Sequence, residues 1–573
     1  MKKQVTPVMM AGAAVALILL ITGIVVLISN LTPSKERMNL SEYYKITEDN
    51  QVAITVNGTV YETYGTLIND HVYLDYKFVH DHINSRFYWD ANENILLYTT
   101  ANDVISAKAE ATSYYIGKSS KDFDREIVKA TADSALIAID FINAYSNITY
   151  TYYDSPSRIV ITNISEDITV ATVKKNTQLR FDTNIKSPIL CDIQKNNTVT
   201  ILETGDKWSL ACSEDGILGY IRSNTIKDIQ DISITDTFKE EFLHIVKEEP
   251  VNLLWHQTTS SSGNAKIATL LSSTKGVNVI SPTWFQVKDK SGELISFASK
   301  DYVTYCHDHN VDVWALVSNF ESLSKEDTVS LLTHTSSRQN LVNQLIAVAL
   351  QYNLDGINVD FEEMSAEDIG DSYIQFIREL SIKCENNDIV LSVDVPVPES
   401  HNDFYEYAEQ SLFADYIILM AYNQHWGPSS GAGSVAAINW VDNMVSTSLE
   451  LGVPSEQLVL GVPFYSRLWN LTPTSEGSED EVEYLVGCET IYMDDAKTWM
   501  KDNVGEPIWL EDCGQWYGET TKNGVIYKLW QEDVTSLEER LKLMQKHSLA
   551  GAAFWKYGQE SSDVWDTIIK YIN

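Results

Sequence analysis

Polar residues recur at every second position near the end of the stretch 354–362, whose sequence is Leu-Asp-Gly-Ile-Asn-Val-Asp-Phe-Glu. This alternation predicts a β-strand, because successive side chains of a strand point to opposite faces. Asn358, Asp360 and Glu362 then share one face, and only apolar side chains lie on the other. Polar groups on such a strand are costly unless they line a cavity or belong to a satisfied buried network. The stretch therefore predicts that these polar side chains line a cavity or a site, with a structural polar network as the alternative.

The same stretch resembles the signature of the family-18 glycoside hydrolases, Asp-Gly-x-Asp-x-Asp-x-Glu. It matches at Asp355, Gly356, Asp360 and Glu362, and it departs at Asn358, where the family has Asp. The resemblance implies substrate-assisted hydrolysis, in which the acetamido carbonyl of the sugar attacks the anomeric carbon. Glu362 would be the acid and base, and Asp360 would hold the acetamido N–H group. Because the amide of Asn358 cannot ionise, we expect an altered pH profile.

Further site residues follow from the resemblance of later strands to those of the family. Met420-Ala421-Tyr422-Asn423 is similar to the family's Met-x-Tyr-Asp, and Trp555 matches the Trp that forms the floor of the sugar site. For Tyr422 the alternative is a rim aromatic, and for Trp284 and Trp426 it is ordinary packing. The expected catalytic residues are Glu362, Asp360, Tyr422 and Asn423. The expected substrate-binding residues are Asn358, Trp555, Trp284, Trp426, Tyr465 and Arg467.

The elements that must position these residues alternate between strands and helices beyond about residue 245. Eight apolar runs separated mostly by helical-period stretches predict a (β/α)8 barrel, or TIM barrel, over residues 245–573. The runs are 251–257, 277–285, 311–319, 354–362, 389–397, 416–423, 458–466 and 551–557. Residues 468–530 exceed a normal connection and predict an α+β insertion after the seventh strand. Active sites of such barrels lie at the C-terminal ends of the strands, where Glu362 is expected.

Two smaller regions precede the barrel. Short strands broken by turns over 168–229 predict a small all-β barrel, and this region resembles a bacterial SH3-like domain. Residues 48–164 contain a weak repeat of about 63 residues, with two strand–turn–strand copies, and resemble the stalk modules named after the N-terminal domain of copper amine oxidases. The name implies no copper chemistry. A polar linker, residues 30–47, comes before both regions.

The N-terminal sequence indicates a membrane. Residues 8–28 form an apolar run, and 21 residues at ~1.5 Å each span the hydrocarbon of a bilayer. Lys2 and Lys3 favour a cytoplasmic N-terminus over residues 1–7. A cleaved signal peptide is the alternative to an uncleaved anchor. The prediction is a single-pass protein of the cell membrane whose catalytic domain is extracellular.

Composition excludes some functions. The formal net charge of -38, from 42 basic and 80 acidic residues, argues against nucleic acid as a partner. We expect no cofactor and no metal, since the clusters 80–82 and 307–309 offer no third ligand. The six cysteines leave two pairings open, Cys191 with Cys212 and Cys488 with Cys513.

Together these features predict a membrane-anchored glycosidase acting on β-1,4-linked N-acetylglucosamine glycan. Peptidoglycan is favoured over chitin because of the anchor and the SH3-like region. One alternative is a lectin-like protein that binds amino-sugar chains without cutting them, although such proteins usually lack the catalytic Glu. A second alternative is a structural protein of the cell envelope.

Overall fold

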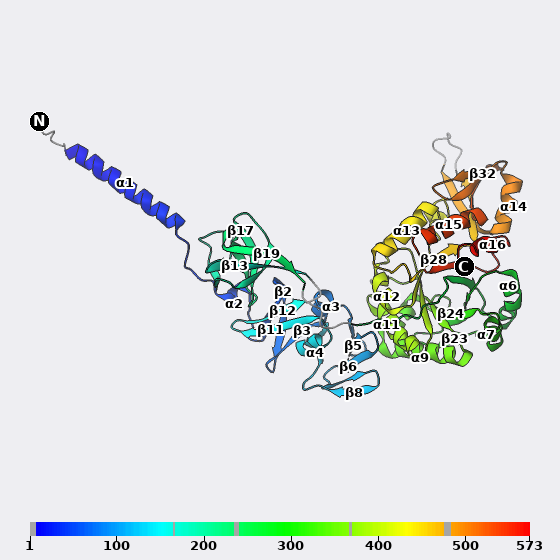
Figure 1. The fold of residues 1–573 in the computed structure, drawn as a ribbon, viewed down its shortest axis with the longest axis horizontal. Coiled ribbons are helices and arrows are strands. Elements are labelled where there is room, and N and C mark those ends of the chain that lie inside the picture. The colour runs from blue at the N-terminus through cyan, green and yellow to red at the C-terminus, as the bar shows by residue number, and fades with distance from the viewer. Residues whose placement is uncertain (1–6, 164–166, 234–239, 366–368, 475–482, 573) are drawn as a thin grey trace. The chain divides into compact units, whose positions relative to one another are not determined.

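The computed structural model describes residues 7–163, 167–233, 240–365, 369–474 and 483–572 (Figure 1). The chain forms two compact units. The first comprises residues 1–89, 107–115 and 119–239, and the second comprises residues 90–106, 116–118 and 240–573. The predicted cytoplasmic segment 1–7 lies outside the described residues except for Pro7, as do residues 475–482 of the predicted insertion.

The first unit begins with helix α1 (Pro7–Leu31), which is four residues longer than the predicted apolar run of 21. Its most apolar stretch of 18 residues has a mean hydropathy of 2.9, and none of the 25 residues of the helix is buried. A helix of this length spans about 37 Å, which exceeds the hydrocarbon thickness of a bilayer. By length and composition α1 fits a membrane span, and it fits an N-terminal signal sequence equally well.

A seven-stranded sheet follows in the first unit, in the order β11-β12-β1-β2-β3-β10-β9. A strand, a short helix and a two-stranded hairpin occur twice in the chain order, as β3-α3-β4-β5 and as β10-α4-β11-β12. The side chain of Asp75 caps α3 by accepting the N–H of Lys77. Between residues 51 and 163, β5 and parts of β4, β6 and β7 belong to the second unit. The bounds are β1 (Gln51–Val56), β2 (Thr59–Ile68), β3 (His71–Asp75), α3 (Tyr76–His82), β4 (Phe87–Asp90), β5 (Ile95–Thr99), β6 (Val104–Lys108), β7 (Ser113–Ile116), β8 (Ser119–Asp122), β9 (Val128–Ala130), β10 (Ala135–Ala138), α4 (Ile139–Ala144), β11 (Ile148–Asp154) and β12 (Ser157–Asn163).

Another seven-stranded sheet of the first unit is antiparallel throughout, in the order β15-β14-β18-β17-β16-β13-β19. Alternate apolar residues of its strands form a separate small core that includes Leu179, Ala211 and Ile221. The six cysteines of the chain are all free thiols. The bounds are α2 (Leu40–Tyr43), β13 (Ile168–Val173), β14 (Thr177–Arg180), β15 (Ile189–Ile193), β16 (Thr198–Glu203), β17 (Trp208–Ser213), β18 (Leu218–Arg222), η1 (Ser223–Thr225) and β19 (Ile226–Ile232).

The second unit contains the predicted barrel. Eight strands pair in parallel around a closed ring, in the order β20-β21-β24-β25-β26-β27-β28-β34 and back to β20. Almost every residue of these strands is buried, because a parallel sheet in a barrel is covered on both faces. The prediction of an eight-stranded barrel is confirmed. The strands are β20 (Val251–His256), β21 (Val279–Pro282), β24 (Asp312–Ser318), β25 (Gly356–Asp360), β26 (Val390–Val395), β27 (Tyr416–Leu419), β28 (Leu458–Pro463) and β34 (Gly551–Trp555).

Several strands end earlier than the sequence predicts. The fourth ends at Asp360 rather than Glu362, and the sixth ends at Leu419. The predicted second strand is divided, since a short hairpin of β22 (Phe285–Val287) and β23 (Leu294–Ser296) follows β21. The predicted catalytic residues therefore lie at strand ends or just past them.

Helices surround the ring and pack on its apolar outer face. Ile357, Val359 and Phe361 of the fourth strand belong to this outer core, which agrees with the predicted alternation. The helices are α5 (Ser261–Asn264), α6 (Ile267–Ser273), α7 (Lys300–His307), α8 (Lys325–Thr333), α9 (Thr335–Tyr352), α11 (Ser372–Glu385), η2 (Asp403–Tyr405), α12 (Tyr407–Phe413), η3 (Pro428–Ser430), α13 (Ile438–Glu450), α15 (Val534–Lys546) and α16 (Val564–Ile568).

Helix α9 begins without a cap from its own segment. The N-cap residue, His334, makes no side-chain cap bond. Instead Asp90, a buried residue in the same compact unit, accepts hydrogen bonds at 2.6 Å from both the backbone N–H and the hydroxyl of Thr335. A carboxylate at this position satisfies an unpaired N–H group and favours the positive end of the helix dipole.

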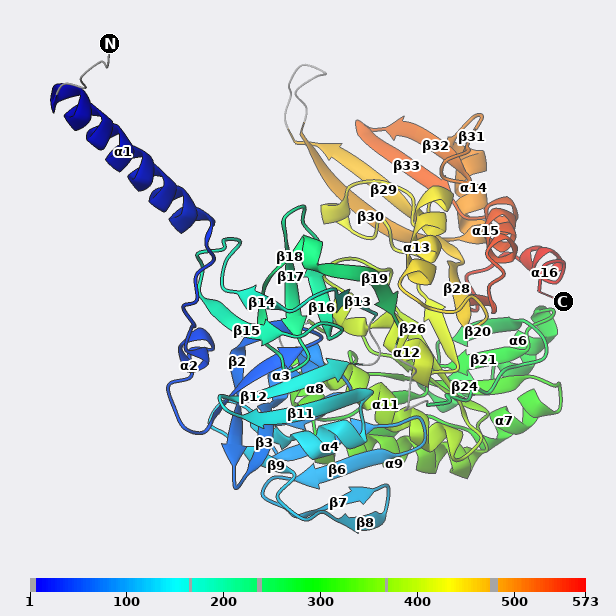
Figure 2. The same cartoon turned by 60° about the vertical axis from the view of Figure 1, so that its left-hand side comes forward.

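A five-stranded sheet, in the order β30-β29-β33-β32-β31, is inserted in the chain between the seventh and eighth barrel strands. Figure 2 shows its strands grouped together with α14. It begins at Tyr465, so Tyr465 and Arg467 belong to its first strand and not to the seventh barrel strand as the sequence suggests. Helix α14 packs on this sheet around a small core of its own. The bounds are β29 (Tyr465–Pro473), β30 (Tyr484–Tyr492), α14 (Met493–Asn503), β31 (Ile508–Leu510), β32 (Gln515–Lys522) and β33 (Val525–Gln531).

Candidate active site

A cavity of about 360 Å³ opens at the C-terminal ends of the barrel strands. This volume is in the range of small-molecule binding sites. Its wall includes residues at or just past strand ends all round the ring, among them Gln257, Thr283, Asp360, Asp394, Met420 and Trp555. The barrel topology thus brings distant segments of the chain to one mouth, as the position of active sites in this architecture predicts.

The two predicted acids line this cavity together. Asp360 is the last residue of β25 and is almost completely buried, whereas Glu362 lies two residues further, at the open mouth. Asn319, which follows β24, forms two hydrogen bonds with the backbone of Glu362 through its side chain. The Oδ1 atom of Asn319 accepts the N–H of Glu362 at 2.9 Å, and its Nδ2 atom donates to the Glu362 carbonyl at 2.9 Å. This pair of bonds fixes the segment from which the Glu362 carboxyl projects.

The environment raises the pKa of both acids. For Glu362, partial burial is the largest cause, followed by the negative charges of Glu363 and Glu321. For Asp360, burial raises the pKa well above its usual range, and the nearby carboxyls of Asp394, Glu362 and Glu321 act in the same direction. A carboxyl whose pKa is raised keeps its proton to higher pH and is therefore better suited to donate it to a leaving group.

One oxygen of Asp360 has no donor within the described part of the chain. Its Oδ1 atom is buried and makes no hydrogen bond there. A buried carboxylate oxygen without a donor costs free energy, so a donor from a bound molecule would be favourable at this position.

Asn358 lies below the cavity and is fully buried, so it does not contact a molecule in the cavity. Its Oδ1 atom accepts hydrogen bonds from the indole N–H of Trp255 at 3.1 Å and from the hydroxyl of Ser281 at 2.9 Å. Its Nδ2 atom donates to Asp394 Oδ1 at 2.9 Å. The expectation that Asn358 binds substrate directly is therefore wrong, because all of its polar atoms are engaged by protein groups.

Tyr422 and Asn423 lie past the end of β27, and both line the cavity. Burial raises the pKa of the Tyr422 hydroxyl well above its usual range, so this group stays a neutral hydrogen-bond donor. Asn423 has a left-handed backbone, with φ of 62°, and its Oδ1 atom accepts the hydroxyl of Tyr465 at 2.6 Å. Tyr465 also lines the cavity, so the first strand of the insertion contributes directly to the site.

The four remaining predicted residues divide into three groups. Trp555 lines the cavity, edge-on to Trp255 with ring centroids 5.7 Å apart. Trp284 is completely buried and donates its indole N–H to Asn264 Oδ1 at 2.8 Å, so the expectation that it walls a subsite is wrong and it is core. Trp426 is 59% exposed, and Arg467 donates to Thr490; neither is among the residues that line the cavity.

Sequence reasoning missed Asp394, Glu321 and Trp255, which all line the cavity. Asp394 had a detectable signal. Ser392 and Asp394 occupy alternate positions in the apolar fifth strand, the same pattern that singled out the fourth. Glu321, which accepts a hydrogen bond from the Ser318 hydroxyl, follows the third strand in a loop without periodicity. No group of three or more metal-ligating side chains is present in the part of the chain that the structure describes.

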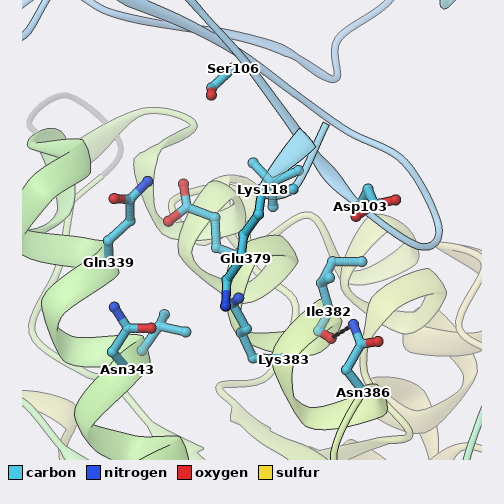
Figure 3. A pocket seen from close by; sticks show the side chains of 12 residues that line it. Asp103, Ser106, Lys118, Gln339, Asn343, Glu379, Ile382, Lys383 and Asn386 are labelled. Atoms are coloured by element: carbon cyan, nitrogen blue, oxygen red, sulfur yellow. Dashed lines mark hydrogen bonds between the residues drawn. The ribbon is translucent and has the colours of Figure 1, made fainter. Parts of the chain in front are cut away.

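A second cavity, of about 310 Å³, lies in the same compact unit beside α9 and α11 (Figure 3). Its charged lining residues are Asp103, Lys118, Glu379 and Lys383. Glu379 is already paired with the buried Arg338 at 3.1 Å. None of the residues expected to act in chemistry lines this cavity, so the candidate active site is the one at the mouth of the barrel.

Comparison with known proteins finds relatives that match slightly less than half of this chain. The Bacillus subtilis protein called uncharacterized glycosylase YvbX is 25% identical over 295 residues, which are 49% of this chain and 81% of that protein. The cortical fragment-lytic enzyme of Bacillus anthracis is 21% identical over 266 residues, which are 44% of this chain and 59% of that enzyme. The chain thus spans less than two thirds of this second relative.

A solved structure and a family model match the barrel. The crystal structure of a C-terminal domain from Desulfitobacterium hafniense DCB-2 superposes with a TM-score of 0.51 at 18% identity, over 57% of this chain and all of that domain, which supports the fold. The model described as glycosyl hydrolases family 18 matches residues 255–560, which include Asp360 and Glu362. Since this match covers more than half of the chain, the protein belongs to family 18 of the glycosyl hydrolases and is a glycosidase.

Proposed function

We propose that this glycosidase is anchored in the membrane, faces outward and cuts β-1,4-linked N-acetylglucosamine glycan by substrate-assisted catalysis with retention. The proposal depends mainly on one observation: Glu362 and Asp360 line the same cavity, and one buried oxygen of Asp360 has no hydrogen-bond donor in the described part of the chain. Asp360 can accept a hydrogen bond from an acetamido N–H group. The carbonyl of the same acetamido group can then act as the nucleophile.

In the first step Glu362 donates its proton to the glycosidic oxygen. The acetamido carbonyl attacks the anomeric carbon, so the bond to the leaving sugar breaks and a cyclic oxazolinium ion forms. Asp360, as an anion, accepts the acetamido N–H and balances the positive charge. The Tyr422 hydroxyl donates to the acetamido oxygen and orients it. In the second step the Glu362 carboxylate takes a proton from water, which attacks the same carbon. The bond from this carbon to the acetamido oxygen breaks, the acetamido group is regenerated, and the original configuration is restored.

The remaining lining residues position the sugar. Trp555 offers an aromatic face at the cavity wall, on which the apolar face of a sugar ring stacks. Asn423 takes the place of a carboxylate and is held by Tyr465. We assign Trp426, which is exposed, and Arg467 to more distant sugar units of a long chain.

Peptidoglycan is favoured over chitin as the substrate. A relative of the chain is named cortical fragment-lytic enzyme, and α1 fits an anchor that would hold the barrel at the cell surface. We infer that residues 168–229, an antiparallel sheet with its own core, form an SH3-like module, and that residues 48–164 are stalk repeats. These modules would present the barrel, residues 245–573, to the wall.

The test is product release from purified peptidoglycan and from chitin oligomers, followed by mass spectrometry. The Glu362→Gln variant is expected to lose activity by about 10²–10⁴-fold, because it removes the proton donor without changing the size of the side chain. The matched control is Glu363→Gln, which changes the adjacent carboxyl and is expected to retain most of the activity at its optimum pH. Substrates without the N-acetyl group should not be cut.

Two results would contradict the proposal. Equal cleavage of N-acetylated and de-N-acetylated glycan would exclude the substrate-assisted step. Tight binding of glycan by the wild type without any product, unchanged in Glu362→Gln, would make the protein a lectin.

A further inference from the structure

Asp394, from the fifth barrel strand, meets the fourth strand at the position where the family signature is broken. Its side chain is 1% exposed, and its Oδ1 atom accepts the amide N–H of Asn358 at 2.9 Å. The orientation of that amide follows from its other partners. The indole N–H of Trp255 can only donate, so it must face the oxygen of Asn358, and the NH₂ group must face Asp394.

The surroundings of Asp394 are acidic or neutral. Burial raises its pKa well above the usual range, and the negative charge of Glu362 adds to this, whereas hydrogen bonding from Asn358 and from the indole of Trp255 opposes it. The charge of Asp394 in turn acts on Asp360. In the described part of the chain no cation is among the groups that act on either residue. The titratable groups that face the pair are Glu362 and Glu321 from loops, Tyr373 from α11, Tyr405 from η2 and Tyr422 from the segment after β27.

Two buried carboxyls without a cation cannot both be charged at moderate cost, so the pair holds one proton. In the family signature the partner of Asp360 is a carboxyl two residues earlier on the same strand. In this chain that position is Asn358, whose amide cannot take up a proton. The carboxyl next to Asp360 comes instead from the neighbouring strand, since β25 and β26 are paired in parallel.

We propose that Asp394 is a positioning residue of the reaction, which takes the proton of Asp360 when Asp360 must face the substrate as an anion, in place of the missing carboxyl at position 358. This inference rests on the proposed function. The proton stays within the pair: the O–H bond on Asp360 breaks, an O–H bond on Asp394 forms, and the reverse transfer follows when the oxazolinium ion is hydrolysed. No proton is exchanged with solvent at this buried position.

A purely structural role for Asp394 gives a different result. If it only accepts the hydrogen bond of Asn358, the amide oxygen of an Asn at position 394 can do the same. The Asp394→Asn variant would then behave like the wild type. If the carboxyl is needed as a proton acceptor, an amide of the same size cannot replace it.

The experiment measures kcat and kcat/KM against pH on a chromogenic N-acetylglucosamine oligomer. The proteins are the wild type, Asp394→Asn and the exchanged pair Asn358→Asp/Asp394→Asn. We expect Asp394→Asn to lose roughly 10²-fold in kcat, as for removal of one preorganised electrostatic partner. Its acidic limb should move to higher pH, because Asp360 must then release its proton to solvent. The exchanged pair restores one carboxyl and one amide and should regain activity and the wild-type limb.

The inference is overturned if Asp394→Asn keeps the wild-type kcat and pH profile. It is also overturned if activity falls with an unchanged profile and the exchanged pair does not recover it. Melting temperatures of all three proteins show whether a loss comes from unfolding. If Asp394→Asn alone fails to fold, recovery or loss of activity in the exchanged pair decides between the two roles. Failure of the proposed function is recognised separately, since the wild type would then release no N-acetylated product at all.

Discussion

Glu362 projects from a segment whose backbone is held on both sides by one side chain, that of Asn319. Because Glu362 lies past the end of β25, strand pairing alone does not fix it. The two hydrogen bonds of the Asn319 side-chain amide take the place of the missing strand hydrogen bonds, so the backbone of Glu362 is held in position relative to Asp360. Preorganisation of this kind is what an acid at a solvent-open mouth requires.

The basic limb of the pH–rate profile reports the acid that must be protonated, which is Glu362. Among the charges that raise its pKa, Glu363 has the largest effect, and Glu363 does not line the cavity. In Glu363→Gln this repulsion is lost, the pKa of Glu362 falls, and the basic limb of kcat/KM moves to lower pH. High salt should shrink the difference between variant and wild type, because a charge near solvent is screened. A limb that stays in place would show that Glu362 is not the group that titrates there.

At this scale the sequence predicted the acids but not their partners. Asp360 and Glu362 follow from alternation within one strand, a local property. Asp394 belongs to another strand, and its approach to Asn358 depends on the register between β25 and β26, which only the folded barrel defines. The prediction for Trp284 was wrong because its residue type does not discriminate: an aromatic residue after a strand fits a sugar site and a packed core equally well.

The elements of the barrel were largely predictable because buried parallel strands appear as continuous apolar runs. The end of the seventh strand could not be predicted, because apolar residues continue from β28 through Phe464 into β29. A continuous apolar run does not show where the chain passes from one sheet to another. The capping of α9 by Asp90 could not be predicted from the sequence either, because Asp90 is far from α9 along the chain.

Removal of that cap should destabilise the barrel. Asp90→Ala leaves the first N–H of α9 without its acceptor and is expected to lower the free energy of unfolding by about 1–2 kcal/mol. Chemical denaturation of the full-length protein measures the change. The comparison variant is Glu93→Ala, since Glu93 accepts the N–H of the next residue, Ser336, at an exposed position, where such a bond contributes less. An effect of Asp90→Ala no larger than that of Glu93→Ala would show that the buried bonds to Thr335 do not stabilise the helix more than the exposed one.

For the molecule as a whole, the fate of α1 decides where the enzyme works. If α1 is an uncleaved anchor, the mature protein keeps residues 7–31 and stays in the membrane fraction after a carbonate wash, because this helix buries apolar residues in lipid. A chain without these residues should be soluble and should cut short N-acetylglucosamine oligomers at the wild-type rate. N-terminal sequencing that begins after residue 31 would identify α1 as a signal peptide.

The eighth barrel strand pairs with both the first and the seventh, and Trp555 stands at its end. A nascent polypeptide that has not yet reached this strand leaves the ring open between β20 and β28, and the wall of the sugar cavity is incomplete. Synthesis therefore passes through a long catalytically silent interval. The hydrolase can therefore become active only after the eighth strand has been made, when α1 has already emerged from the ribosome.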